Sequence, residues 1–180
     1  MKTLLLGMGN PILSDDAVGV RLARDIGKRL AGTTGLSIVE ECSVGGLNIL
    51  DIVSGFDRLI VLDSMRTARG IPGEWHRFTS DSLRGTMHLN NIHDVNFATA
   101  LELGRRMGMS LPSGEDIHIF TVEVQDNATF SEVMTGLLER SYPVYFGGIL
   151  MEIEEILAGS DADTVHPEWN KEVEHDYSPE

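Results

Sequence analysis

Two carboxylates and one histidine, at three separate places in the sequence, are the residues best suited to chemistry. Asp16 follows the first apolar run, Asp63 is the last residue of RLIVLD, and His93 opens a stretch of helical apolar spacing. If the three side chains meet, two carboxylates and an imidazole that leave open coordination positions could bind a divalent transition metal. Each residue also has an ordinary structural interpretation, because helix starts favour acids and polar caps.

The other histidines compete less well for this role. His88 lies in the same polar stretch as His93 and is its nearest competitor. His76 and His118 lie in expected strands, and we interpret them as surface or edge residues. The remaining two are in the acidic carboxyl-terminal stretch, where a site is not expected.

Short apolar runs alternate with stretches of helical spacing along the chain. Apolar residues at Val18, Leu22, Ile26 and Leu30 predict one face of a helix, which Ser14 or Asp15 would cap. A break is expected at Pro143, because proline removes a backbone donor. Strands are expected at 3–6, 36–40, 58–63, 74–78 and 117–124, and the other helices at about 47–54, 93–107, 131–140 and 149–157.

This alternation predicts a single three-layer α/β domain over residues 1–157, with a mostly parallel twisted sheet of about five strands and helices on both faces. In such sheets, ligands bind outside the carboxyl ends of the strands. If the first and third strands are neighbours, as in flavodoxin-like or phosphorylase-like folds, Asp16 and Asp63 converge there. His93, at the start of its helix, can then close over them.

Charge and composition restrict the function classes. The 180 residues include 28 Asp+Glu against 14 Lys+Arg, a net charge of −14, which argues against nucleic-acid and anionic-membrane partners. No window approaches the roughly 18 apolar residues of a membrane span, and the run at 4–6 is too short for a signal-peptide core. A single cysteine suits the cytoplasm. Residues 158–180 carry −6 of the charge, and we interpret them as a flexible acidic tail.

Two familiar motifs are present only in part. Gly7-Met8-Gly9 suggests a dinucleotide loop, but the third glycine position holds Ile12, and Asp15 and Asp16 would repel a pyrophosphate. Asp63-Ser64 suggests an aspartic protease, but the glycine that should follow is replaced and no second copy exists to form a dyad.

The segment GMGNPILSDDAVGVRLARDI at 7–26 resembles the amino-terminal signature of the hydrogenase maturation proteases, with glycines, Asn10 and both acids in place. These are nickel-dependent endopeptidases that trim the large subunit of nickel–iron hydrogenases. RLIVLDS at 58–64 and HDVNFATAL at 93–101 resemble two further family segments in the same order, and SVGGL at 43–47 resembles its glycine-rich turn. The similarity covers roughly residues 3–150. Gln125-Asp126-Asn127 departs from the family pattern after the last strand.

The resemblance implies an aspartyl-type endopeptidase that removes a carboxyl-terminal extension from the hydrogenase precursor. Asp16, Asp63 and His93 would be the catalytic and metal-binding residues, and Gly45 and Gly46 would contact the substrate. The nickel would arrive in the precursor, and no resident organic cofactor is expected. Two other functions stay open: a non-enzymatic binder of the nickel site, and a nucleotide-binding module of the flavodoxin or Rossmann kind.

Overall fold

A five-stranded sheet forms the centre of the molecule. The computed structural model describes residues 1–42, 46–79 and 92–159. The strand order is β2-β1-β3-β5-β4, with the first four strands in this order parallel and β4 antiparallel to β5. The expected mostly parallel sheet is therefore confirmed, and the first and third strands are neighbours, which is the condition for Asp16 and Asp63 to share an edge. The strands are β1 (Thr3–Met8), β2 (Leu36–Cys42), β3 (Arg58–Met65), β4 (Trp75–Thr79) and β5 (Ile117–Glu123).

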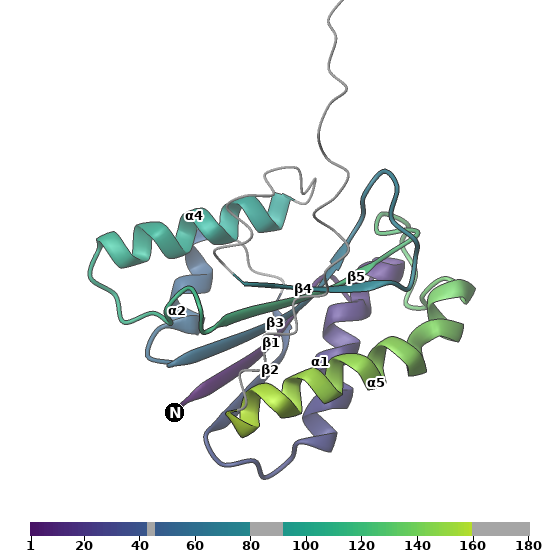
Figure 1. Cartoon of the computed structure of the whole chain (residues 1–180). Coiled ribbons are helices and arrows are strands. Elements are labelled where there is room, and N and C mark those ends of the chain that lie inside the picture. Colours follow the sequence, from purple (N-terminus) through teal and green to yellow (C-terminus); the bar gives the residue numbers. More distant parts are fainter. Residues whose placement is uncertain (43–45, 80–91, 160–180) are drawn as a thin grey trace, which may run out of the picture.

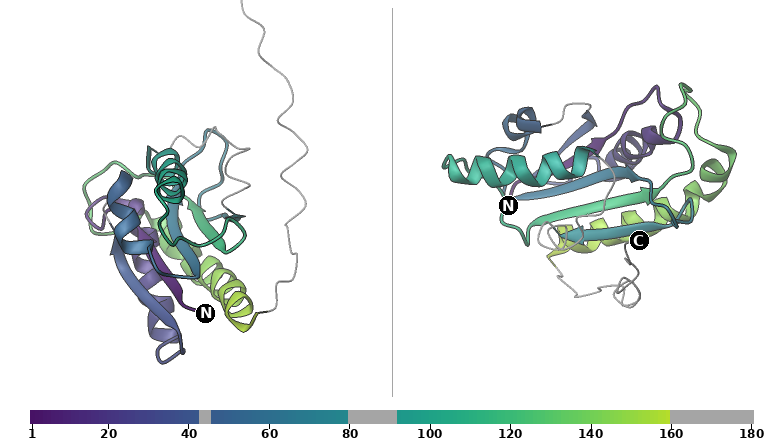
Figure 2. Two further views of the ribbon diagram at one scale, coloured as in Figure 1. Left: turned by 90° about the vertical axis from the view of Figure 1, so that its left-hand side faces the viewer. Right: turned by 90° about the horizontal axis from the view of Figure 1, so that it is seen from above.

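Helices cover both faces of the sheet, giving the three layers expected from the sequence (Figures 1 and 2). The apolar residues of α1 and α5 share one buried cluster with one face of the strands. Residues of α2 and α4 share a second cluster with the opposite face. The helices are α1 (Val18–Arg29), α2 (Ile49–Val53), α4 (Ile92–Arg106) and α5 (Gly136–Ala158), with short 3-10 turns η1 (Ser14–Ala17) and η2 (Gly46–Asn48).

The inner strands are buried on both faces, which explains their uninterrupted apolar sequences. Every residue of β1, β3 and β5 is buried. Alternate side chains of β3 enter opposite clusters: Ile60 and Leu62 pack toward α1 and α5, whereas Leu59 and Val61 pack toward α2 and α4. By the same alternation Asp63 belongs to the α4 face and Ser64 to the α1 face.

Helix α1 lies against the sheet with no side chain between the two backbones at Gly19. A Cβ atom added at Gly19 would run into the backbone oxygens of Met8 and Leu62. This close contact brings the start of α1 against the ends of β1 and β3. The turn that carries Asp16 is thereby held beside the end of β3.

Three local predictions were wrong. The N-cap of α1 is Ala17, without a side-chain cap, and neither Ser14 nor Asp15 caps the helix. Helix α5 continues through Pro143, and His118 is buried at 3% exposure, with Nδ1 3.3 Å from Nη2 of Arg77.

Packing explains why α5 continues through Pro143. Pro143 is on the exposed side of the helix, where water can replace the backbone hydrogen bond that proline removes. The opposite side is a continuous buried stripe, whose burial outweighs the roughly 3 kcal/mol cost of an interior proline. The stripe consists of Leu138, Tyr142, Tyr145, Ile149, Ile153 and Ile156.

Within the described ranges, none of the helices combines the length and the apolar character that crossing a membrane requires.

Candidate functional site

The loop after β1 curls back so that its backbone holds Asp16. The backbone N–H of Asn10 donates to Oδ2 of Asp16 at 2.8 Å. Gly9 makes this return possible, because its φ is +126° and a Cβ there would strike the backbone oxygen of Asp16. The glycine of the motif therefore serves to place a carboxylate.

Ser64 links the two carboxylates that the sequence analysis singled out. Its hydroxyl donates to Oδ1 of Asp16 at 2.7 Å, and its backbone N–H donates to Oδ1 of Asp63 at 2.8 Å. Asp63 is buried at 4% exposure, whereas Asp16 is half-buried. The structure thus brings Asp16 and Asp63 to the same carboxyl edge of the sheet, through the serine that follows Asp63.

This arrangement suits carboxylates that bind a cation. Each oxygen of Asp16 accepts one hydrogen bond and has a second lone pair available. Hydrogen bonds of this kind orient metal-binding carboxylates in proteins. The same carboxylates could instead accept a proton from an attacking water.

The remaining predicted site residues are placed only in part. His93 is in the first turn of α4, but its side chain lies outside the described part of the structure. Because α4 runs back toward the start of β5, that first turn is at the carboxyl edge of the sheet. Gly46 begins η2, whereas Gly45 and His88 lie outside the described residues. Among the residues that are described, no cluster of three or more His, Cys, Asp or Glu could hold a metal ion, so the three-residue centre stays a prediction.

Asp15 has a different role from its neighbour, although the two carboxylates are adjacent in sequence. Asp15 is 0% exposed and its side chain accepts four hydrogen bonds from the segment between β5 and α5. The donors are the backbone N–H groups of Gln125 at 3.1 Å, Asp126 at 2.9 Å and Thr135 at 2.6 Å, and the Thr135 hydroxyl at 3.1 Å. Asp15 therefore ties the loop after β1 to the loop after β5.

The segment that departs from the family pattern is part of this attachment. The backbone N–H of Asp15 donates to the carbonyl of Asp126 at 3.0 Å. The Asp126 side chain closes its own turn by accepting from the backbone N–H groups of Ala128 and Thr129. Hydrogen bonds from Thr129 and Ala128 lower the pKa of the Asp126 carboxyl, and the positive charge of Arg66 adds to this effect. Gln125 and Asp126 thus form the turn that joins this segment to Asp15.

The glycine-rich start of the chain does not offer a phosphate site. In a dinucleotide loop, backbone N–H groups after the first strand point at the pyrophosphate. Here the N–H of Asn10 already donates to a carboxylate of the same loop, at 2.8 Å. A phosphate at this place would meet the negative charge of Asp16, which disfavours the nucleotide-binding alternative.

Comparison with solved structures identifies the fold. The chain superposes on the hydrogenase maturating endopeptidase HybD from Escherichia coli with a TM-score of 0.71, covering 87% of this chain and 94% of that one at 21% identity. The chain has the fold of the hydrogenase maturation endopeptidases. The [NiFe] hydrogenase maturation protease HybD from Thermococcus kodakarensis is also similar, with a TM-score of 0.63, 16% identity and coverage of 87% and 99%.

Sequence comparison agrees with this fold but spans less of the chain. The Hydrogenase 2 maturation protease of E. coli (strain K12) is 30% identical over 73 residues, which are 41% of this chain and 44% of that protein. The aligned stretch thus spans less than half the length of that curated relative. No protein-family model matches the chain. The resemblance indicated by the motifs is confirmed at the level of the fold.

Sequence reasoning missed the residues that support the two carboxylates. Ser64 was considered only as part of an incomplete aspartic-protease motif, although a serine directly after a strand-end aspartate can donate to a neighbouring acid. Asp15 was considered as a helix cap. Its hydrogen-bond partners are 110 to 120 residues away in the sequence, so no nearby motif indicates them. Glu123 was also missed: it is a carboxylate with 1% exposure at the end of β5.

Proposed function

We propose that this protein is an endopeptidase that removes the carboxyl-terminal extension of a nickel–iron hydrogenase large-subunit precursor in the cytoplasm. The observation that carries the proposal is that Ser64 links Asp16 and Asp63 at the carboxyl edge of a sheet with the maturation-endopeptidase fold. The names of the similar proteins supply the activity and the class of substrate.

In the proposed reaction, nickel enters as part of the substrate. Asp16 and Asp63, together with His93 from α4, would bind the nickel that the precursor carries and so align one peptide bond. The nickel would polarise the scissile carbonyl or lower the pKa of the attacking water. Alternatively, the nickel only anchors the precursor, and one of the aspartates takes the proton of the water as a general base. In both cases the water oxygen bonds to the carbonyl carbon, the carbon–nitrogen bond of the peptide breaks, and the leaving amine takes up the proton that the water gives up.

The surface around the carboxylates suits a protein substrate. Ile12, Phe130 and Val133 are 48%, 80% and 65% exposed, on the two loops that Asp15 joins. These loops also pair directly, because the N–H of Ser131 donates to the carbonyl of Ile12 at 3.0 Å. Exposed apolar side chains grouped beside a site are typical of contact with another protein.

The decisive experiment compares cleavage of nickel-loaded and nickel-free precursor by the full chain. We expect a shortened large subunit and a released peptide only from the nickel-loaded form. Equal cleavage of both forms would overturn nickel recognition. Metal-dependent association without any released peptide would instead support the non-enzymatic binder and overturn the peptidase activity.

The same assay identifies the roles of the three residues. Asp16→Asn, Asp63→Asn and His93→Ala should each abolish cleavage of the nickel-loaded precursor, since a neutral or shortened side chain cannot complete the site. An exposed surface change such as Arg29→Gln, in the last turn of α1, serves as the matched control. Full activity in Asp16→Asn would contradict the proposed centre.

A further inference from the structure

A buried glutamate organises the segment that follows Asp63. Glu123 is the last residue of β5 and lies opposite Met65, the last residue of β3. Its side chain is 1% exposed and accepts a hydrogen bond from the backbone N–H of Thr67. The backbone of Glu123 binds the far end of the segment. The N–H of Gly73 donates to the carbonyl of Glu123, and the N–H of Glu123 donates to the carbonyl of Glu74, both at 2.8 Å.

One residue therefore fixes both ends of the segment 66–73. The middle is fixed as well, because Gly70 packs directly on the carboxyl group of Glu123, leaving no room for a Cβ atom. The second carboxyl oxygen, Oε2, has no hydrogen-bond partner among the described residues. An unpaired buried acceptor lowers the stability of the folded state. A carboxylate kept here at that cost suggests that the segment it holds has a function.

The segment held in this way carries two exposed arginines, Arg66 and Arg69. Neither forms an ion pair with another residue in the described ranges, although most arginines of those ranges bind an acid or a carbonyl. Arg66 directly follows the last residue of β3 and is three residues beyond Asp63. Its charge also reaches Asp126, whose backbone binds Asp15. The segment that carries the two arginines therefore lies at the edge that holds the candidate site.

These positive charges stand out on a chain with a net charge of −14. Such a chain repels acidic partners over most of its surface, whereas these two exposed cations attract a carboxylate that comes close to them. Guanidinium groups match carboxylates in geometry and bind them in bidentate fashion.

We propose that the segment 66–73 is a substrate-recognition arm, in which Arg66 and Arg69 bind carboxylates of the protein substrate next to the bond to be cleaved. Glu123 is the positioning residue of this arm. The proposal rests on the proposed function, since it assigns part of the binding of that substrate. It specifies an acidic stretch of chain as the feature recognised.

Peptide binding tests the arm without requiring cleavage. The probe is a fluorescent 12-residue peptide with four glutamates, compared by anisotropy with the same peptide in which glutamine replaces each glutamate. We expect the full chain to bind the acidic peptide more tightly, and the double variant Arg66→Gln/Arg69→Gln to lose up to about fivefold in affinity per arginine. The preference should also weaken as salt rises to about 0.15 M, because screening reduces attraction between exposed charges.

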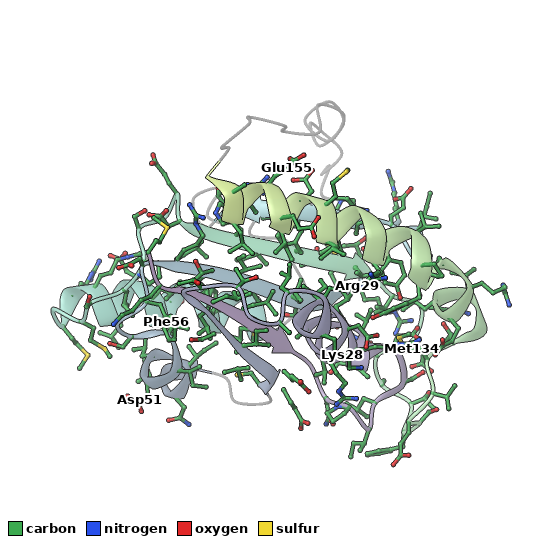
Figure 3. All side chains as sticks on the ribbon, turned by 90° about the horizontal axis from the view of Figure 1, so that it is seen from below. Lys28, Arg29, Asp51, Phe56, Met134 and Glu155 are labelled. Atoms are coloured by element: carbon green, nitrogen blue, oxygen red, sulfur yellow. The ribbon has the colours of Figure 1, made fainter. Side chains whose placement is uncertain are left out.

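Arg29→Gln is the matched control, because it removes one exposed positive charge, without an ion pair among the described residues, at the opposite end of α1 (Arg29 is labelled in Figure 3). It should bind both peptides as the unchanged chain does. An equal loss in Arg29→Gln, or no loss in the arginine double variant, would overturn the arm.

The role of Glu123 has its own pair of variants. Glu123→Ala removes the acceptor for Thr67 and should weaken acidic-peptide binding as much as the loss of both arginines, whereas Glu123→Gln keeps an acceptor oxygen and should restore it. Adding Glu123→Ala to the arginine double variant should bring no further loss, because both changes remove the same interaction. Additive losses, or a Glu123→Ala chain that is folded and binds normally, would overturn the positioning role.

Precursor cleavage separates this inference from the proposed function. If the nickel-loaded precursor is cleaved but neutralising its acidic residues leaves KM unchanged, the arm is wrong and the peptidase activity stands. If the precursor is not cleaved but the arginines still select the acidic peptide, the proposed peptidase activity is contradicted and the binding of acidic chain by the arm is supported.

Discussion

Asp15 and Thr135 are joined by two hydrogen bonds: the backbone N–H of Thr135 donates to Oδ1 of Asp15 at 2.6 Å, and its hydroxyl donates to Oδ2 at 3.1 Å. Thr135 is the residue before α5, so this contact fixes where that helix begins. Asp16, the next residue, points its carboxylate to Asn10 and Ser64 instead. Two adjacent acids of one motif are therefore divided between two loops, and only Asp16 is left for the proposed chemistry.

This division predicts opposite effects for two equivalent substitutions. Asp15→Asn should lower the free energy of unfolding by about 3 kcal/mol, because a buried amide cannot accept all four hydrogen bonds and carries no charge. Asp16→Asn should change it by less than about 1 kcal/mol, since the side chain is half-buried. Urea unfolding of both variants measures the difference. Similar losses in the two would contradict the division.

Ser64→Ala tests the link between the carboxylates. Without the hydroxyl, Asp16 loses the donor to Oδ1 and keeps only the Asn10 N–H on Oδ2, so its carboxylate is oriented less firmly. We expect kcat/KM for nickel-loaded precursor to fall about 10- to 100-fold, as for other groups that orient metal ligands. Ser37→Ala, at an exposed position of β2, should leave kcat/KM unchanged. Unchanged cleavage by Ser64→Ala would show that Asp16 is oriented without it.

Glycine-to-alanine changes in α1 should separate packing from helix propensity. Alanine improves helix propensity by about 1 kcal/mol relative to glycine. Gly19→Ala should nevertheless destabilise the protein by about 3 kcal/mol, because its Cβ meets backbone oxygens that cannot move aside.

Gly27→Ala is the control in the same helix. Its Cβ would approach only the side chain of Ile38, at 3.1 Å, which can shift. Thermal unfolding should therefore show a neutral or slightly higher midpoint for this variant. A gain in stability for Gly19→Ala would contradict the close contact between α1 and the strands.

Tyr142 makes stability sensitive to alkaline pH. Burial raises the pKa of its phenol well above the usual value of 10.0, and the hydrogen bond that it donates to Oδ2 of Asp25 raises it further. Because the folded pKa is the higher one, this contribution to stability is complete below pH 10. It is lost as the pH rises from there, since the unfolded chain then releases its proton first.

Tyr142→Phe keeps the ring that stacks on Phe146 but removes the titrating group. At pH 7 it should cost about 1 kcal/mol for the lost hydrogen bond. Between pH 7 and 10.5 its urea midpoint should fall less than that of the unchanged chain. Equal falls would show that Tyr142 does not titrate in this way.

Much of the fold could be predicted from apolar periodicity. The uninterrupted apolar run Leu59 to Leu62 is typical of a strand covered on both faces, and the strand found there is buried throughout at the centre of the sheet. The helix through Pro143 could not be predicted, because its stability comes from tertiary contacts of residues that follow the proline. The burial of His118 likewise depends on the antiparallel pairing of β4 with β5, which the sequence does not reveal.

The sequence could predict only those parts of the candidate site whose position follows from the order of the strands in the sheet. Once β1 and β3 are neighbours, the residues that follow them must share an edge, which places Asp16 near Asp63. The direction of each side chain within that edge could not be predicted. Asp15 and Asp16 have the same chemistry, and only the loop that each meets decides its role. The metal-binding role of His93 and the substrate contacts of Gly45 and Gly46 stay predictions.

The partners of Asp15 come late in the chain. Its hydrogen bonds to Gln125 and Thr135 span 110 and 120 residues, and Met134, beside Thr135, is at the far end of the molecule from Phe56 (Figure 3). During synthesis, Asp15 and its neighbour Asp16 therefore emerge from the ribosome long before the loop that binds Asp15. The attachment of Asp15 is complete only when Thr135 has emerged, so a shorter nascent chain lacks the contact that fixes the turn carrying Asp16.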